Sequence, residues 1–146
     1  MERSMGISHL GAAAAAGLLV SSLGAAAQEA GPHISIELNA VAPAETGCLI
    51  SFLARNGYET GIDRAVFETV LIDGQGQVER LTLFDFGALP AGRPRMRQFS
   101  VPGLDCGDLG QILINGTTAC EAEALDEEAC AEGLGLSSRT DVELIG

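Results

Sequence analysis

The chain has 146 residues and a formal net charge of −12, from 20 acidic residues against eight basic ones, all of which are arginine. An acidic chain of this kind is repelled by nucleic acid and by anionic lipid surfaces, so both are excluded as partners. The two histidines and four cysteines leave few side chains for catalysis.

The first 27 residues are predicted to be a secretory signal peptide. An apolar stretch at 11–20 is too short for a membrane-spanning helix, which needs roughly 20 residues. Ala25 and Ala27 then form an A-x-A pattern, which predicts cleavage after Ala27. The mature part, 28–146, is expected to be one periplasmic or secreted domain that leaves the membrane after signal cleavage.

Seven strand-like segments follow in chain order. Ile34, Ile36 and Leu38 alternate with polar residues, as in a strand with one buried face. The segment 65–73 is apolar on both faces, which predicts a central strand covered on two sides. After the Asp73–Gly76 turn, alternation places Val78, Thr82, Phe84 and Phe86 on one face. The predicted strands cover 33–41, 48–56, 65–73, 77–86, 95–101, 109–115 and 139–145, with a Pro/Gly loop at 87–95.

Seven short strands separated by turns are the pattern of a seven-stranded immunoglobulin-like (fibronectin-III-like) sandwich, with strands A to G. A small closed barrel is the alternative. The connection between strands F and G contains the acidic segment 121–132, whose helix-forming composition predicts a short helical turn. A bend is expected to follow, because an unbroken helix would separate Cys120 from Cys130 by about 15 Å, too far for a disulfide.

The four cysteines are expected to form two structural disulfides, because exported chains are oxidised and no C-x-x-C redox motif is present. In an up-and-down succession, strands B and F run the same way. Cys48 begins strand B and Cys106 lies just before strand F, so they share one pole, while Cys120 and Cys130 lie at the other. Because a disulfide tolerates Cα separations of only about 7 Å or less, the predicted pairs are Cys48–Cys106 and Cys120–Cys130.

Two charged clusters are candidate binding sites. The acidic 121–132 segment carries six carboxylates, which are potential calcium ligands. Their spacing matches no EF-hand loop, so no metal site is predicted and a solvated loop is favoured. Arg93, Arg95 and Arg97 offer bidentate donors to a carboxylate or phosphate. The alternative is that their charge protects an edge strand from pairing with other chains. Alternation places Arg95 and Arg97 on the same strand face as the inward Phe99, so either their side chains snorkel to the sheet edge or a bulge shifts the register.

Enzyme chemistry finds little support in the mature sequence, and no cofactor is predicted. His33 is its one histidine, so a Ser-His-Asp or Cys-His system would depend on that residue. No G-x-S-x-G, H-E-x-x-H or phosphate-loop motif occurs.

The segments SFLARN, VLIDGQGQVERL and LPAGRPRMRQFSV, between Ser51 and Val101, resemble the core of bacterial FxLYD-type and related immunoglobulin-like domains. Thr69 and Ile72 stand where the family's name has Phe and Tyr. The resemblance implies a small extracytoplasmic binding or accessory module without catalysis. The matching residues are Leu71, Asp73, Gly76, Pro90, Gly92 and Phe99.

Two functions are expected from these features. The first is an exported, non-catalytic β-sandwich that binds another extracytoplasmic protein. The second is a binder of a small ligand or cation through the acidic 121–132 segment or the Arg93, Arg95 and Arg97 cluster.

Overall fold

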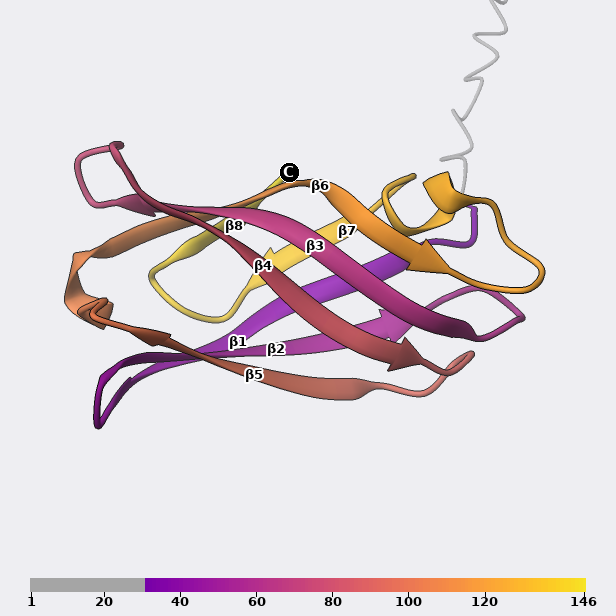
Figure 1. The fold of residues 1–146 in the computed structure, drawn as a ribbon, viewed down its shortest axis with the longest axis horizontal. Helices are drawn as coiled ribbons and strands as arrows, with labels where there is room; N and C mark the ends of the chain where they lie inside the picture. The colour runs from indigo at the N-terminus through magenta and orange to yellow at the C-terminus, as the bar shows by residue number, and fades with distance from the viewer. Residues whose placement is uncertain (1–30) are drawn as a thin grey trace, which may run out of the picture.

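Alternating apolar side chains fold residues 31–146, the part of the chain that the computed structural model describes, into two facing β-sheets (Figure 1). The predicted signal peptide, with its cut after Ala27, lies outside these residues. The elements are β1 (Ile34–Ala44), β2 (Gly47–Asn56), β3 (Ile62–Asp73), β4 (Val78–Leu89), β5 (Arg95–Pro102), η1 (Cys106–Asp108), β6 (Leu109–Glu121), η2 (Glu127–Cys130), β7 (Gly135–Ser138) and β8 (Glu143–Ile145), where η denotes a 3-10 turn.

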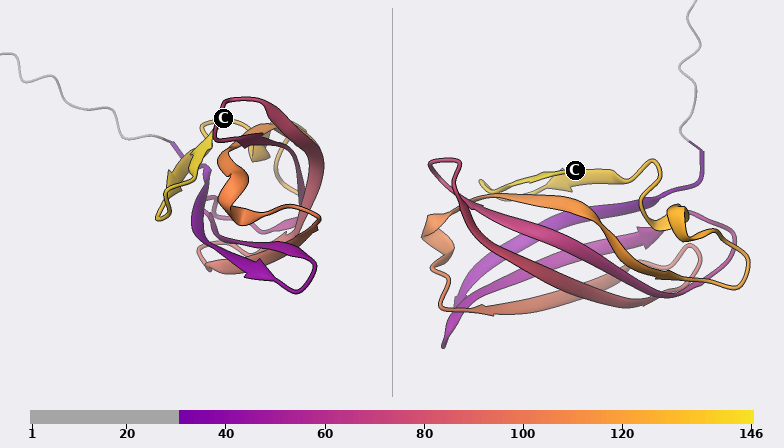
Figure 2. Two further views of the ribbon diagram at one scale, coloured as in Figure 1. Left: turned by 90° about the vertical axis from the view of Figure 1, so that its left-hand side faces the viewer. Right: turned by 45° about the horizontal axis from the view of Figure 1, so that its top comes forward.

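The first sheet has the strand order β5-β2-β1-β7, and the second has the order β4-β3-β6-β8. Both are mixed, because β7 runs parallel to β1 and β8 runs parallel to β6, while the other pairs are antiparallel. The end-on view in Figure 2 shows the two sheets facing each other around the core. The predicted all-β sandwich is therefore confirmed, and the strands do not form the single sheet of a closed barrel.

The core lies between the sheets and contains a cluster of phenylalanines among its isoleucines and leucines. Ile34, Ile36 and Leu38 of β1 are at most 1% exposed, which confirms the predicted buried face. Phe52 of the first sheet contacts Phe84 and Phe86 of the second, with ring centroids 5.7 and 5.5 Å apart. Such aromatic contacts between facing sheets hold the two layers together.

The β4 strand corrects the predicted face of Val78. Phe84 and Phe86 point into the core as expected, but Val78 is 68% exposed. A register shift in the β3–β4 ladder pairs Leu71 with Arg80 but Ile72 with Val78. Because one extra residue in a strand reverses which face the following side chains take, Val78 lies on the outer face.

The end of the chain also differs from the single predicted strand at 139–145. Only Glu143–Ile145 of that range forms a strand, which is β8 in the second sheet, and the chain bends before it. The preceding β7 lies in the first sheet, within the segment predicted to connect strands F and G. The Ser138 Oγ donates to Val142 O at 2.6 Å, and the Thr140 Oγ1 accepts from Val142 N at 3.0 Å. Hydroxyl groups that bind the neighbouring main chain in this way favour a turn over a continuous strand.

The predicted pairing of Cys48 with Cys106 is confirmed, with a Cα–Cα distance of 5.1 Å. Cys48 lies near the start of β2 in the first sheet, and Cys106 begins η1, just before β6 in the second. The bridge therefore joins the two sheets at one pole. Within residues 31–146, no helix has the length and apolar character needed to cross a membrane.

Candidate functional site

The predicted arginine cluster lies along the seam where edge strands β4 and β5 of the two sheets meet. Arg97 donates through Nε to Phe86 O, and through its terminal nitrogens to Ala88 O (2.9 Å) and Met96 O (3.1 Å). From the opposite strand, Arg80 donates to Pro102 O at 2.7 Å. The two guanidinium groups thus bind main-chain oxygens across a seam that has no strand pairing of its own.

The three clustered arginines do not converge on one open site. The β2–β5 ladder pairs Arg95 with Ala54 and Arg97 with Phe52 and has no bulge, so both side chains start on the core face and leave it at the sheet edge. The snorkelling alternative is therefore the one the structure adopts. Arg95 donates to Pro94 O at 3.1 Å, and Arg93 is exposed in the preceding loop.

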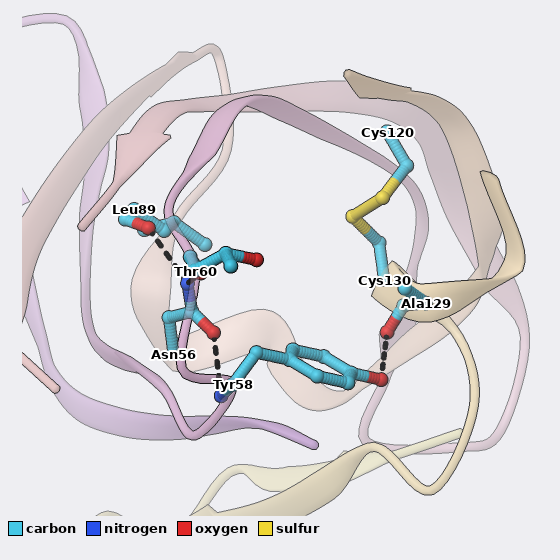
Figure 3. Close-up of a disulfide and its surroundings, with 7 residues drawn as sticks. All are labelled: Asn56, Tyr58, Thr60, Leu89, Cys120, Ala129 and Cys130. Carbon is cyan, nitrogen blue, oxygen red and sulfur yellow. Dashed lines mark hydrogen bonds between the residues drawn. A yellow bond between two sulfur atoms is a disulfide. The ribbon is translucent and has the colours of Figure 1, made fainter. Parts of the chain in front are cut away.

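At the pole opposite Cys48–Cys106, a second set of contacts holds the acidic segment in place (Figure 3). The predicted Cys120–Cys130 disulfide is confirmed, with Cα atoms 5.8 Å apart. The predicted reversal of the segment is also present, because η2 is a single 3-10 turn ending at Cys130. The Tyr58 hydroxyl donates to Ala129 O at 2.8 Å, and burial, with a smaller effect of Glu132, raises the pKa of this phenol.

Asn56, which sequence reasoning missed, is the buried polar residue beside Tyr58 (Figure 3). Its Nδ2 donates to Leu89 O and Thr60 O, both at 2.9 Å, and its Oδ1 accepts from Tyr58 N at 2.9 Å. The side chain thus ties the end of β2 to the end of β4 in the other sheet. Because its hydrogen-bonding groups are satisfied within the protein, we assign it a structural role. The Asn-Gly pair at 56–57 was the signal available in the sequence.

The acidic 121–132 segment does not concentrate its carboxylates. Glu121, Glu123, Asp126, Glu127, Glu128 and Glu132 are all exposed. Within residues 31–146, no group of three or more His, Cys, Asp or Glu side chains is placed to hold a metal ion. His33, the candidate base, is half-buried and its Nδ1 lies 2.8 Å from Gly31 O.

Several hollows open on the described surface, and two of them lie beside features already described. One, of about 330 Å³, lies beside β6 and is lined largely by apolar groups, among them Phe67, Ile114, Leu134 and Leu136. The other, of about 290 Å³, follows the β4–β5 seam between Leu83 and Phe99. Neither of these two linings brings together a nucleophile and a base.

The most exposed apolar side chains lie on the outer face of the second sheet. The registers place Leu81, Val70, Leu113 and Ile145 side by side across β4, β3, β6 and β8, and we call these four residues the outer apolar row. Leu81 is 58% exposed and Ile145 is 38% exposed. Leu83, at 55%, and Val78, at 68%, extend the apolar surface along β4. The right-hand view in Figure 2 turns this sheet toward the reader.

The outer apolar row corrects the prediction that β3 is covered on two sides. Val66 and Val70 face outward and are only 5% and 8% exposed, yet Leu81 and Leu83 beside them are more than half exposed. The two valines are therefore shielded by side chains of their own sheet. An apolar run on both faces of a strand is typical of a strand with a covering layer, but it also fits a face that binds another molecule.

Charged groups border this face. Arg64 Nη2 lies 2.9 Å from Asp85 Oδ2 and donates to it, and this hydrogen bond, with one from Gly87 N, lowers the pKa of Asp85. Arg64 also lies 3.8 Å from Glu121. Glu68 accepts from the Asn115 amide, and Glu143 accepts from the Gln111 amide at 2.7 Å. The outer apolar row thus lies between carboxylates.

Comparisons of the chain with protein-family models, curated proteins and solved structures found no match. The two disulfides indicate an oxidising, extracytoplasmic environment, because such bonds persist there and are rare in the cytosol.

Proposed function

We propose that this protein is an exported, non-catalytic binding module of immunoglobulin-like fold that binds another protein in the periplasm or outside the cell. The observation that carries the proposal is the exposed apolar surface around Leu81, Leu83 and Ile145. Exposed apolar side chains that gather on one face of a soluble protein commonly mark an interaction site.

The immunoglobulin-like part of the proposal is supported by how the strands divide. β1, β2 and β5 share one sheet, while β3, β4 and β6 share the other, with β4 in the place of the extra strand next to strand C of variable-type domains. The Cys48–Cys106 bridge links the sheets from the start of β2, which corresponds to strand B, to the turn just before β6, which corresponds to strand F. One departure is that β8 runs parallel to β6, because β7 adds a reversal of the chain.

The proposal is tested by site-specific photocrosslinking in the cells that export the protein. A photoreactive residue replaces Leu81 on the proposed binding face, and the matched control replaces Arg55, which is exposed on the outer face of the first sheet. We expect a discrete crosslinked protein partner from the Leu81 position that is absent from the Arg55 position. Equal patterns from both positions, or no adduct from either, would contradict the proposed function.

A further inference from the structure

The outer apolar row is bordered on two sides by carboxylates that no basic group neutralises within residues 31–146. Along β3, Glu68 lies on the same outward face as Val70, and along β8, Glu143 lies on the same face as Ile145. Their described partners are the neutral amides of Asn115 and Gln111, which orient the carboxylates but leave their charge. The nearby cation Arg64 is already paired with Asp85 and Glu121.

This charge pattern disfavours two of the possible occupants. If a second copy of the chain packed face to face, it would bring Glu68 and Glu143 of both copies to one interface, where like charges repel. An anionic lipid surface is repelled in the same way, and the net charge of −12 adds to the repulsion.

The spacing of the row fits one class of secondary structure. Neighbouring strands lie about 4.8 Å apart, so the four side chains follow each other at that interval across the sheet. Apolar residues on one face of an α-helix recur at each turn of about 5.4 Å, which is close to this spacing. A helix lying across the strands therefore places successive apolar side chains along the row.

From these observations we propose that the outer apolar row binds a basic amphipathic helix of a partner protein, with its apolar stripe on Leu81, Val70, Leu113 and Ile145 and its lysines or arginines beside Glu68 and Glu143. This inference rests on the proposed function and specifies the chemistry of the partner. Burial of the leucine and isoleucine side chains supplies affinity, and the carboxylates select a cationic partner.

The test uses the disulfide-bonded protein and two helical probe peptides with the same leucine stripe, one carrying lysines and the other glutamates. We expect the lysine peptide to bind and to shift the backbone amide NMR signals of Leu81, Val70 and Leu113, and the glutamate peptide to leave them unchanged. Leu81→Ser is expected to weaken binding about tenfold, from the lost apolar contact.

Matched charge variants separate recognition at this face from attraction to an acidic protein in general. The double variant Glu68→Gln/Glu143→Gln is expected to weaken binding at least about threefold, whereas Glu123→Gln/Glu127→Gln, which removes the same charge from the acidic 121–132 segment, leaves it within about twofold. Equal losses in both variants, or NMR shifts confined to the acidic segment, would overturn the inference. If the lysine peptide does not bind while the photocrosslink from Leu81 is still formed, the inferred partner chemistry is wrong and the proposed binding function is retained. If the crosslink is also absent, both the inference and the proposed function are contradicted.

Discussion

Asn56, Tyr58 and Arg97 donate hydrogen bonds to main-chain oxygens of other elements. Asn56 binds Leu89 O, Tyr58 binds Ala129 O, and Arg97 binds Phe86 O and Ala88 O. A carbonyl left without a donor in a partly buried place costs more than the hydrogen bond contributes. These three side chains are therefore expected to contribute measurably to the stability of the fold.

Arg97 offers a direct test at the seam. We expect Arg97→Met, which keeps the aliphatic stem but removes the donors, to lower the free energy of unfolding by about 1 to 2 kcal/mol. The free energy of unfolding of Arg97→Lys is expected to lie between those of the wild type and Arg97→Met, because an ammonium group cannot reproduce the planar fork of a guanidinium. Urea unfolding measures both, and the control Arg93→Met, at an exposed position, should stay within about 0.5 kcal/mol. Equal effects at both positions would show that the seam contacts contribute nothing.

Tyr58 can be titrated alone, because the chain has one tyrosine and no tryptophan. Burial raises its pKa, so the phenolate absorbance should appear above the ordinary tyrosine range of about 10 in the folded protein and within that range in urea. Since the folded state holds the proton more tightly, the stabilisation is present below pH about 10 and is lost as the pH rises through the folded pKa. Tyr58→Phe removes that alkaline loss. Coincident folded and unfolded titrations would contradict the burial of this phenol.

At the scale of elements, the two disulfides close loops of different length at opposite poles. Cys48 and Cys106 are 58 residues apart in the sequence, and Cys120 and Cys130 are 10 apart. One bridge joins the two sheets, and the other shapes the turn that carries the acidic segment. The two bridges should therefore differ in how much they stabilise the protein and in which part of it they hold in place.

Removing each bridge separately tests this difference. By the loop-entropy relation we expect Cys48→Ala/Cys106→Ala to cost about 4 kcal/mol and Cys120→Ala/Cys130→Ala about 3 kcal/mol. The second variant is also expected to increase hydrogen exchange mainly in 122–134, because Tyr58 then provides the remaining described tether of Ala129. Chemical unfolding and hydrogen exchange measure the two effects. Exchange that increases across β1 and β2 in the second variant would contradict a local role.

At the scale of the whole molecule, the second sheet presents one face to the core and another to its surroundings, and both are apolar. Leu71 is fully buried between the sheets, whereas Leu81 on the neighbouring strand is 58% exposed. The same residue type thus serves stability on one face and, in our proposal, binding on the other.

A pair of alanine variants separates these two roles. Leu71→Ala is expected to lower the free energy of unfolding by about 2 to 5 kcal/mol, because it leaves a cavity in the core. Leu81→Ala should change it by no more than about 0.5 kcal/mol. Thermal and urea unfolding provide both values. A large loss for Leu81→Ala would mean that the outer apolar row is covered within the free protein, and the binding proposal would lose its main support.

Local patterns in the sequence were enough to predict the strands at the start of the domain, the turn at Asp73–Gly76 and both cysteine pairs. In the turn, Gly76 has a φ of 84° and Asp73 Oδ1 accepts from Gln75 N and Gln77 N, which are short-range contacts that the residue types favour. The disulfides followed because strand direction alone decides which cysteines share a pole. In each case the contact is local, or it follows from an up-and-down chain.

Tertiary structure decided the features that depend on register and on which sheet a segment joins. One shift in the β3–β4 ladder turned Val78 outward, and hydroxyl contacts at Ser138 and Thr140 shortened the last predicted strand to β8, with a turn between it and β7. The outer apolar row exists only because residues from four strands, distant in sequence, align across the second sheet. Alternation along one strand does not specify its neighbours, so neither this row nor the seam contacts of Arg97 were visible before the strands were paired.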